Sequence, residues 1–407
     1  MSKRRVVITG SGVISPLGRG VPAMFAGLKE GRTGVQRAAC LEGVQGLSAR
    51  LAGLVTDVDV KEVPRPLRRS MSAMSVYAYL AALEALESAA FALTDESREN
   101  LGVCIGSTVG SPATMEDFFA SYLPGRSVES MKSMLFFRIM GHTAAANTAQ
   151  ALGLTGRILA PSAACASGLL AVGTAYESIA AGREDAVLCG GADEFHPLTA
   201  ATFDVLGAHS PSLDPETAPR PFDAARDGVV CAEGAGVLLL ESYASALGRG
   251  APILAEVAGF HARGDASSIA NPDPLPVYLC MKKALEDAAL KPEDADYVNA
   301  HATGTRHGDP AEAAAIVKLF GKGVPVSSLK GHLGHTMAAS GATELAACLA
   351  MLREGLLIPT RNLSEPDPAC AGADYLLATR KQPVHILVKN SFALGGVACS
   401  LVIKGTQ

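Results

Sequence analysis

The sequence has no tryptophan, and aromatic residues make up only 5% of its 407 residues. Charged residues are also sparse, at 18%, and 35 Lys and Arg against 40 Asp and Glu leave a formal net charge of −5. A mildly acidic chain lacks the positive charge on which non-specific nucleic-acid binding depends. We therefore expect no nucleic acid among its partners.

Its nine cysteines are scattered, with no CxxC pair and no cluster at zinc-ligand spacing, so we expect reduced thiols and no metal site. The longest apolar runs are interrupted by Gly, Ser, Glu or Arg, which argues against a membrane span. After its first charges the chain enters a predicted strand, without the apolar segment of a signal peptide. These features together predict a cytoplasmic protein.

Apolar residues and glycine are abundant. Hydrophobic residues make up 48% of the chain, and 42 glycines favour tight turns and close helix–sheet packing. The length exceeds what a single small core usually organises. We expect two structural halves, 1–250 and 251–407, or one large duplicated fold.

Strand-like and helix-like segments alternate along the chain, which favours α/β layers. In the first half, strands are predicted at 4–9, 102–107, 186–189 and 234–241, with helices at 71–92 and 166–181. In the second half, strands are predicted at 253–258, 297–300, 324–327, 385–389 and 399–403, with helices at 275–289, 310–319 and 336–353. The strands at 4–9 and 186–189 are each predicted to end at a glycine pair. Identity between the halves is too weak to establish a repeat.

One cysteine differs from the other eight in its surroundings. Cys165 lies among small residues in the segment PSAACASG, residues 161–168, and an Ala-rich helix is predicted directly after it. The positive end of that helix's dipole would lower the thiol pKa and favour the nucleophilic thiolate. The alternative is a buried core cysteine, which we expect for the other eight.

Two histidines lie on Gly-containing loops between a predicted strand and a predicted helix. His301 lies in NAHATGT, residues 299–305, and His335 ends SLKGHLGH, residues 328–335, with Glu344 on the helix that follows. A lone histidine is more often structural, but two on such loops indicate a site. The residues by themselves support a cysteine–histidine acyl-transfer site and no finer assignment.

Six ordered segments resemble the β-ketoacyl synthase family across nearly the whole chain. They are residues 4–18, 161–168, 220–228 with 233–236, 299–305, 330–335 with Gly341 and Glu344, and 390–396. The resemblance implies a thiolase-like fold, with two similar α/β halves in α-β-α-β-α layers and a buried helix layer between mixed sheets.

The same resemblance implies a decarboxylative Claisen condensation. Cys165 would take an acyl group from a phosphopantetheine thioester, and His301 and His335 would donate hydrogen bonds to the enolate oxygen as CO2 leaves a malonyl thioester. Lys330 and Glu344 would order the second histidine loop. No cofactor of the enzyme's own is implied, because the acyl carrier protein of the substrate carries the pantetheine.

Supporting roles follow from the resemblance in the same way. Thr303 and Thr305 would hydrogen-bond to the pantetheine arm. The backbone N–H groups of Cys165 and Leu394 would bind the oxyanion, and Phe392 and Leu394 would belong to a gating loop. The acyl pocket would be bordered by Val109, Phe203 and Leu394.

A basic segment precedes the first long helix. By resemblance, Arg65, Arg68 and Arg69 would receive an acidic acyl carrier protein. The alternative is a solvated basic turn. A further basic position of this patch is replaced by Leu206.

The last loop departs from the family pattern. Residues 393–398 are ALGGVA, whereas the family usually has GFGGTN, so Leu394 replaces a gating aromatic. This difference favours a specialised polyene or polyketide ketosynthase. The alternatives are housekeeping fatty-acid elongation and a non-condensing chain-length subunit, although the retained Cys165, His301 and His335 speak against the latter. The resemblance implies a homodimer, or a heterodimer with a partner that resembles a chain-length factor.

Overall fold

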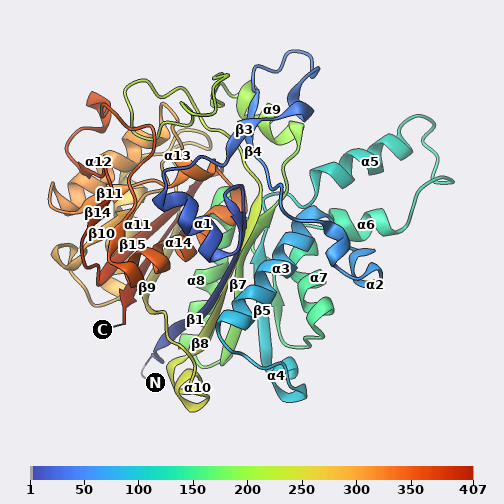
Figure 1. The fold of residues 1–407 in the computed structure, drawn as a ribbon, viewed down its shortest axis with the longest axis horizontal. Helices are drawn as coiled ribbons and strands as arrows, with labels where there is room; N and C mark the ends of the chain where they lie inside the picture. The colour runs from blue at the N-terminus through green and yellow to red at the C-terminus, as the bar shows by residue number, and fades with distance from the viewer. Residues whose placement is uncertain (1–2, 407) are drawn as a thin grey trace.

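The computed structural model describes residues 3–406, which fold around a long mixed sheet (Figure 1). Its strand order is β13-β11-β10-β15-β16-β9-β1-β8-β7-β5-β6, with β2 beside β1. In the first half, the strands are β1 (Val6–Ser15), β2 (Gly18–Arg19), β5 (Leu101–Gly106), β6 (Ile158–Leu159), β7 (Ala186–Asp193) and β8 (Gly234–Ser242). In the second half, they are β9 (Ala255–Gly264), β10 (Tyr297–Asn299), β11 (Pro325–Ser327), β13 (Asp374–Tyr375), β15 (Ile386–Ala393) and β16 (Val397–Gly405).

The two halves of the sheet repeat one pattern of strand pairing. β1 is antiparallel to β8, and β8 is antiparallel to β7. β7 is parallel to β5, and β5 is parallel to β6. β9, β16, β15, β10 and β11 follow the same order of antiparallel and parallel pairs. β1 and β9 join the halves along Val6 to Ile8. The duplication is therefore present in the strand pairing, although the residue letters do not establish it.

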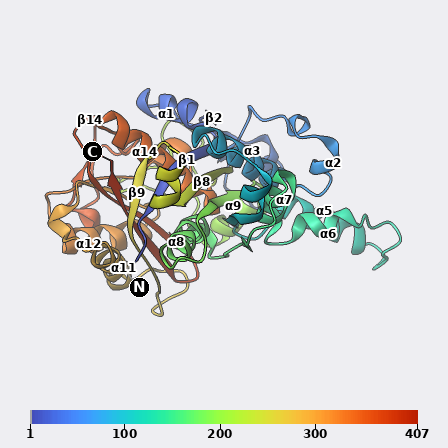
Figure 2. The same ribbon diagram turned by 90° about the horizontal axis from the view of Figure 1, so that it is seen from below.

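Helices cover the outer faces of both halves and fill the space between them (Figures 1 and 2). On the outside, α3 (Ala73–Ser88) packs on β1 and β8, and α11 (Pro274–Asp287) packs on β9 and β16. Between the halves, α8 (Ser167–Ala180) contacts β7 and β9, and α14 (Ser340–Glu354) contacts β8 and β15. The predicted α-β-α-β-α layering, with a buried helix layer, is confirmed.

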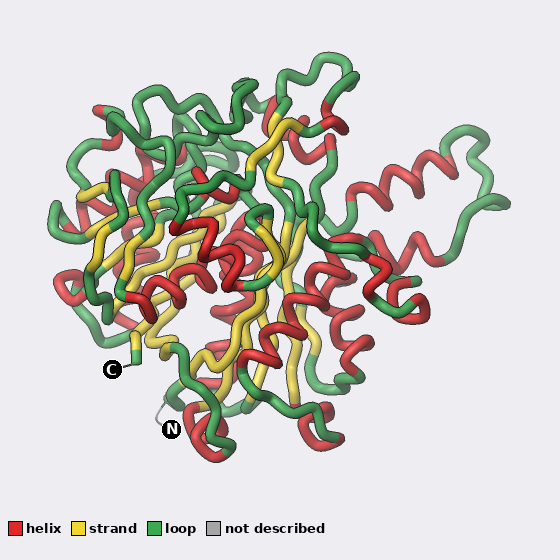
Figure 3. The backbone as a smooth tube through the Cα atoms, in the orientation of Figure 1, coloured by secondary structure: helices red, strands yellow, loops and turns green. Residues whose placement is uncertain are grey.

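The remaining elements border this core. Two small sheets pair β3 (Val35–Arg37) with β4 (Leu51–Gly53), and β12 (Leu356–Leu357) with β14 (Arg380–Lys381). The other helices are α1 (Val21–Lys29), α2 (Arg65–Arg68), α4 (Asp95–Asn100), α5 (Pro112–Tyr122), α6 (Met134–Ile139), α7 (Thr143–Leu152), α9 (Pro197–Val205), α10 (Tyr243–Gly248), α12 (Gly308–Phe320) and α13 (Lys330–Leu333). The tube in Figure 3 shows α5 and α6 projecting from the body of the molecule. Within residues 3–406, no helix has both the length and the apolar composition to cross a bilayer.

Four strands run well past their predicted ends: β1, β7, β9, which continues to Gly264, and β15, which continues to Ala393. The first strand does not end at its glycines, because β1 continues through Gly10 and Gly12 to Ser15. A Cβ at either glycine would come within 2.0 Å of a backbone carbonyl of α3, so glycine here permits close packing against a helix. β7 likewise runs through Gly190 to Asp193.

Candidate active site

Cys165 lies in a short turn between β6 and α8. The turn is a 3-10 helix, Ala164–Ala166, and Ala164 has a φ of 44°, in the left-handed region that residues other than glycine rarely adopt. A strained residue of this kind persists where the surrounding fold enforces it, often at an active site. The turn places Cys165 in an apolar cluster with Phe203, Val229 and Met337.

Cys165 is buried, with 4% of the residue exposed. Burial raises its pKa to about 12, the carboxylate of Asp193 acts in the same direction, and the ammonium of Lys330 opposes both. The predicted lowering of the pKa by the dipole of α8 is therefore wrong, because desolvation in an apolar cluster dominates. The sulfur therefore rests as a thiol, and it would have to lose its proton to act as a nucleophile.

His301 and His335 enter the same pocket from different loops. His301 follows β10 and His335 follows α13, and their ring centroids lie 5.2 Å apart with the planes at 82°. Burial, reinforced by the ammonium of Lys330, lowers the pKa of His335 to about 3 and that of His301 well below its usual value. Both side chains are therefore neutral imidazoles near neutral pH, each with one N–H to donate.

Three ring nitrogens of these histidines have no partner among residues 3–406. They are Nδ1 of His301 and both Nδ1 and Nε2 of His335, all of them buried. A buried polar atom without a hydrogen bond is costly in free energy, so these atoms are suited to meet a ligand. With Cys165, the two histidines line a pocket of about 230 Å³.

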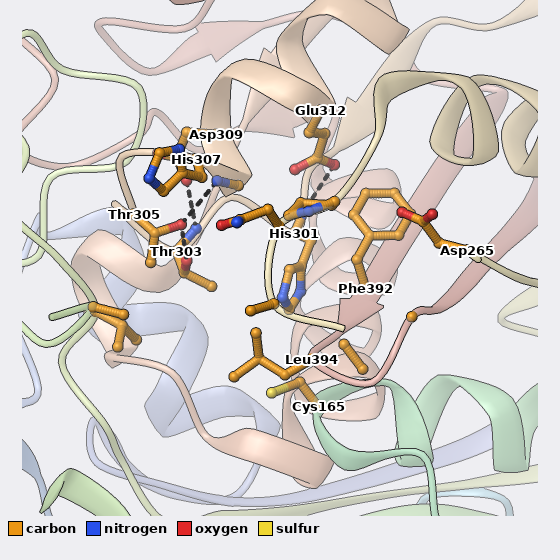
Figure 4. A pocket seen from close by; sticks show the side chains of 18 of the residues that line it. Cys165, Asp265, His301, Thr303, Thr305, His307, Asp309, Glu312, Phe392 and Leu394 are labelled. Atoms are coloured by element: carbon orange, nitrogen blue, oxygen red, sulfur yellow. Dashed lines mark hydrogen bonds between the residues drawn. The ribbon is translucent and has the colours of Figure 1, made fainter. Parts of the chain in front are cut away.

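Two carboxylates behind the first histidine loop hold its backbone. Glu312 of α12 accepts the N–H of His301 at 2.9 Å and that of Ala302 at 2.7 Å, as Figure 4 shows for His301. Asp309 accepts the N–H of Thr303 at 3.1 Å. Burial raises the pKa of Asp309 to about 7 and that of Glu312 above its usual value. The loop is thus fixed from the helix that follows it.

A buried ion cluster supports the second histidine loop. Lys330 and Glu344 come together, with Nζ to Oε1 at 2.6 Å, and Lys389 of β15 donates to Oε2 of the same carboxylate at 2.7 Å. Burial alone would raise the pKa of Glu344, but the two ammonium groups outweigh it and hold the pKa at about 2. The carboxylate is therefore ionised at any pH at which the protein is expected to work.

Six further residues singled out in the sequence line this pocket: Phe203, Leu206, Thr303, Thr305, Phe392 and Leu394. The hydroxyl of Thr303 donates to that of Thr305 at 3.2 Å. The ring centroid of Phe392 lies 5.8 Å from that of His301. Figure 4 shows Leu394 beside Cys165. Val109 does not line the pocket and is 55% exposed, because the chain leaves the sheet after β5 towards α5.

The basic segment lies on the surface at α2. Arg65, Arg68 and Arg69 line a shallow depression together with Lys61 and Arg138. The guanidinium of Arg138, on α6, donates to the carbonyl of Arg69 at 2.9 Å. The structure therefore adds two cations to the three that the sequence singled out.

Sequence reasoning missed Glu312, Asp309 and Lys389. The sequence contains a signal for the two acids, because they lie three residues apart on the helix that directly follows the His301 loop. Lys389 had none, because its partner Glu344 lies 45 residues earlier in the chain.

Two family models match most of the chain. Residues 3–246 match the model described as "Beta-ketoacyl synthase, N-terminal domain", and residues 254–364 match "Beta-ketoacyl synthase, C-terminal domain". The chain belongs to the β-ketoacyl synthase family. Its reaction class is that of a β-ketoacyl-acyl-carrier-protein synthase, an acyltransferase that catalyses a Claisen condensation.

Similar curated proteins span the full length of this ketosynthase. The 3-oxoacyl-[acyl-carrier-protein] synthase 2 of Vibrio harveyi is 36% identical over 416 residues, covering 99% of each chain. Nodulation protein E of Rhizobium meliloti is 35% identical over 406 residues, covering 98% of this chain and 99% of its own.

Solved structures match equally closely. A β-ketoacyl synthase from Burkholderia phymatum has a TM-score of 0.95 at 40% identity, covering 99% of this chain and all of its own. The ishigamide ketosynthase/chain length factor has a TM-score of 0.92 at 32% identity, and the AntDE:AntF complex of a ketosynthase with a type II polyketide acyl-carrier protein has 0.91 at 31%. Both of these matches cover all of both chains.

Proposed function

We propose that Cys165 accepts an acyl chain from an acyl carrier protein and that the enzyme condenses it with malonyl-carrier protein in specialised polyene or polyketide biosynthesis. The observation that carries the site assignment is the convergence of this thiol and two neutral histidines with unpartnered nitrogens on one pocket. The pantetheine thioesters bring the reacting groups, and the enzyme supplies no cofactor of its own.

Acyl transfer is the first step. The sulfur of Cys165 attacks the carbonyl carbon of the acyl thioester, the bond to the pantetheine sulfur breaks, and the thiol proton leaves with that sulfur. The backbone N–H groups of Cys165 and Leu394 stabilise the oxyanion.

Condensation follows on a malonyl thioester. The bond to the carboxylate breaks, CO2 leaves, and the enolate oxygen accepts hydrogen bonds from His301 and His335. The new carbanion attacks the acyl carbonyl, a carbon–carbon bond forms, and the thiolate of Cys165 leaves and regains a proton. Neutral N–H donors suit this step, because negative charge develops where they are fixed.

The departure at the gate favours a specialised acyl substrate. Leu394 lies beside Cys165, where the family usually has an aromatic side chain, and a leucine leaves more room and cannot stack. Housekeeping elongation is the second candidate, favoured by the 36% identity to a 3-oxoacyl-[acyl-carrier-protein] synthase 2. The two candidate functions predict different acyl chains as the ones that load best onto Cys165.

Two features of the surface support contacts with two protein partners. The cations of α2 with Lys61 and Arg138 stand out on a chain of net charge −5, which suits an acidic acyl carrier protein. The arm formed by α5 and α6 exposes three large aromatic side chains, Phe119, Phe136 and Phe137. Exposed apolar side chains gathered on one arm favour burial in a dimer, with an identical chain or with a partner that resembles a chain-length factor. The division into halves at residue 250 and a cytoplasmic location are part of the same proposal.

Intact-protein mass spectrometry tests the assignment. Wild-type protein and Cys165→Ala are incubated with a panel of acyl-carrier thioesters, saturated and unsaturated. A gain of one acyl mass that is lost in the variant identifies the nucleophile, and preference for unsaturated chains supports the specialised role. Best loading of long saturated chains would support the elongation alternative. No loading, with or without an added partner subunit, would refute the proposed function.

A further inference from the structure

Lys389 is a fully buried lysine in the middle of a central strand. It lies in β15 between β10 and β16, with Asn299 and Leu401 as its register partners, and its side chain is 0% exposed. The steps proposed above do not use it. Lysine is almost never completely buried unless it is paired, so its partners indicate its role.

Two acceptors hold its ammonium group. Nζ donates to Oε2 of Glu344 at 2.7 Å and to the carbonyl oxygen of Asn390 at 2.6 Å. The other carboxylate oxygen of Glu344 accepts from Lys330 at 2.6 Å. Two ammonium groups thus share one carboxylate, and two positive charges with one negative charge leave this cluster at +1.

Within this cluster of three side chains, the second ammonium has no carboxylate of its own. Lys330 by itself neutralises Glu344, and both side chains are buried. Burying a further charge is strongly unfavourable, and an apolar residue in β15 would avoid the cost. Charge retained against such a cost is characteristic of functional sites.

The first path from Lys389 leads to His335. Glu344 connects it to Lys330, the first residue of α13, and the carbonyl of Lys330 accepts the N–H of Gly334 at 2.9 Å. His335 is the next residue. The position of this imidazole therefore depends on the carboxylate that Lys389 holds from the strand side.

The second path leads to His301. Asn390, whose carbonyl accepts from Lys389, donates through Nδ2 to Oε1 of Glu312 at 3.0 Å. The same Oε1 accepts the backbone N–H of His301 at 2.9 Å. Lys389 is therefore the point at which the supports of both histidine loops meet.

The charge of Lys389 also suits the substrate of the proposed function. A malonyl group brings a carboxylate into the pocket, and loss of CO2 creates an enolate between the two histidines. An ammonium in a low-dielectric wall favours both anions. Glu312 is the acid that faces the same histidines from α12, and its carboxylate is occupied by two backbone N–H groups and an amide.

We propose that Lys389 is a positioning residue of the condensation site. Its ammonium fixes Glu344 and Asn390, which keeps the two histidine N–H groups on the enolate oxygen, and its charge favours the malonyl carboxylate. It acts through these neighbours, because it does not line the pocket. The inference rests on the proposed function.

Lys389→Met removes the charge and the donors but keeps a long apolar side chain, and the Lys330–Glu344 pair remains neutral. We expect CO2 release from malonyl-carrier protein to fall by about tenfold to a hundredfold, with a raised KM. The reason is that the reaction rate falls steeply when the hydrogen-bond donors of the two histidines are displaced from the enolate oxygen. Acyl loading of Cys165 should stay within about twofold of wild type. The matched control is Leu387→Met, on the same face of β15 and equally buried, which should leave both steps unchanged.

Unchanged CO2 release in Lys389→Met, or equal losses of release and loading, would overturn the proposal, since the latter outcome describes a merely structural residue. If circular dichroism shows that this variant does not fold, Lys389→Gln, which retains an amide donor, is measured with the same two criteria. Wild-type protein that releases no CO2 would refute the proposed function and this inference together. Normal wild-type release with normal release by the variant refutes this inference alone.

Discussion

Glu344→Gln is the sharpest test of the buried ion cluster. The carboxylate lies between two ammonium groups, 2.6 Å from Nζ of Lys330 and 2.7 Å from that of Lys389, and all three side chains are buried. Glutamine keeps the shape of the side chain but removes the negative charge. Two neighbouring ammonium groups then lose the carboxylate that compensates them.

The expected loss of stability in Glu344→Gln follows from the pKa of Glu344. The two lysines hold the pKa of Glu344 at about 2, against a usual 4.5. A difference of about 2.5 pH units corresponds to about 3 kcal/mol of unfolding free energy. Removing one partner of a buried pair typically costs about 3–5 kcal/mol, which agrees. With an unfolding entropy of about 2.1 cal/mol/K for each of the 407 residues, Tm at neutral pH should fall by about 4 °C.

The effect should also depend on pH with a definite sign. Because the folded pKa of Glu344 lies below the unfolded one, its stabilisation is complete above about pH 4.5 and is lost as the pH falls towards about 2. Calorimetry of both proteins at about pH 7 and about pH 3.5 should therefore show a smaller difference in acid.

The control for this experiment is Glu354→Gln on the same helix. Glu354 is partly exposed and pairs with Lys29 at 3.0 Å, so its loss should change Tm by less than about 1 °C. An equally small change for Glu344→Gln, or a change that does not depend on pH, would refute the reasoning.

Three further predictions concern the reaction. His335→Ala should slow CO2 release by about tenfold or more, because it removes a donor to the enolate oxygen; unchanged release would contradict that role. Since burial keeps the pKa of His335 at about 3 and that of His301 well below its usual value, both stay neutral, and the pH profile of CO2 release should show no midpoint near about pH 6.5. Such a midpoint would mean that one of them is protonated there. Leu394→Phe should shift the preferred acyl chain in the loading assay, and an identical profile would make the gate substitution neutral.

The reactive loops were predictable from the sequence because each motif is continuous. Cys165 and His301 each lie in a short segment of mostly small residues between a strand and a helix, and His335 lies in a Gly-containing segment directly after α13. A resemblance over seven or eight residues locates all three. What continuity cannot supply is the distance between loops. The 5.2 Å separation of the histidine rings depends on β10 and β11 being neighbours in the sheet, and no residue pattern states that pairing.

The pKa of Cys165 shows how a local rule can fail. The rule that a helix N-terminus lowers a thiol pKa needs only the sequence position of the helix. Desolvation depends on what packs around the sulfur, and here residues from distant parts of the chain, such as Phe203 and Met337, supply that surrounding. For the pKa of this thiol, the contribution of tertiary packing outweighs the helix-dipole contribution, which sequence spacing alone would predict.

Lys389 is a second residue whose environment depends on tertiary packing rather than on its local sequence. A lysine in an apolar run is typical of a strand end or an exposed edge, and the sequence accordingly predicts a strand that stops at this residue. β15 instead runs on to Ala393 with a neighbouring strand on each side, so the lysine is central and buried. Only the packing of α14 against this face brings Glu344 to its ammonium. In the role proposed here for Lys389, a residue that breaks the local pattern and finds a buried ionic partner beside two buried histidines marks a site where function outweighs stability.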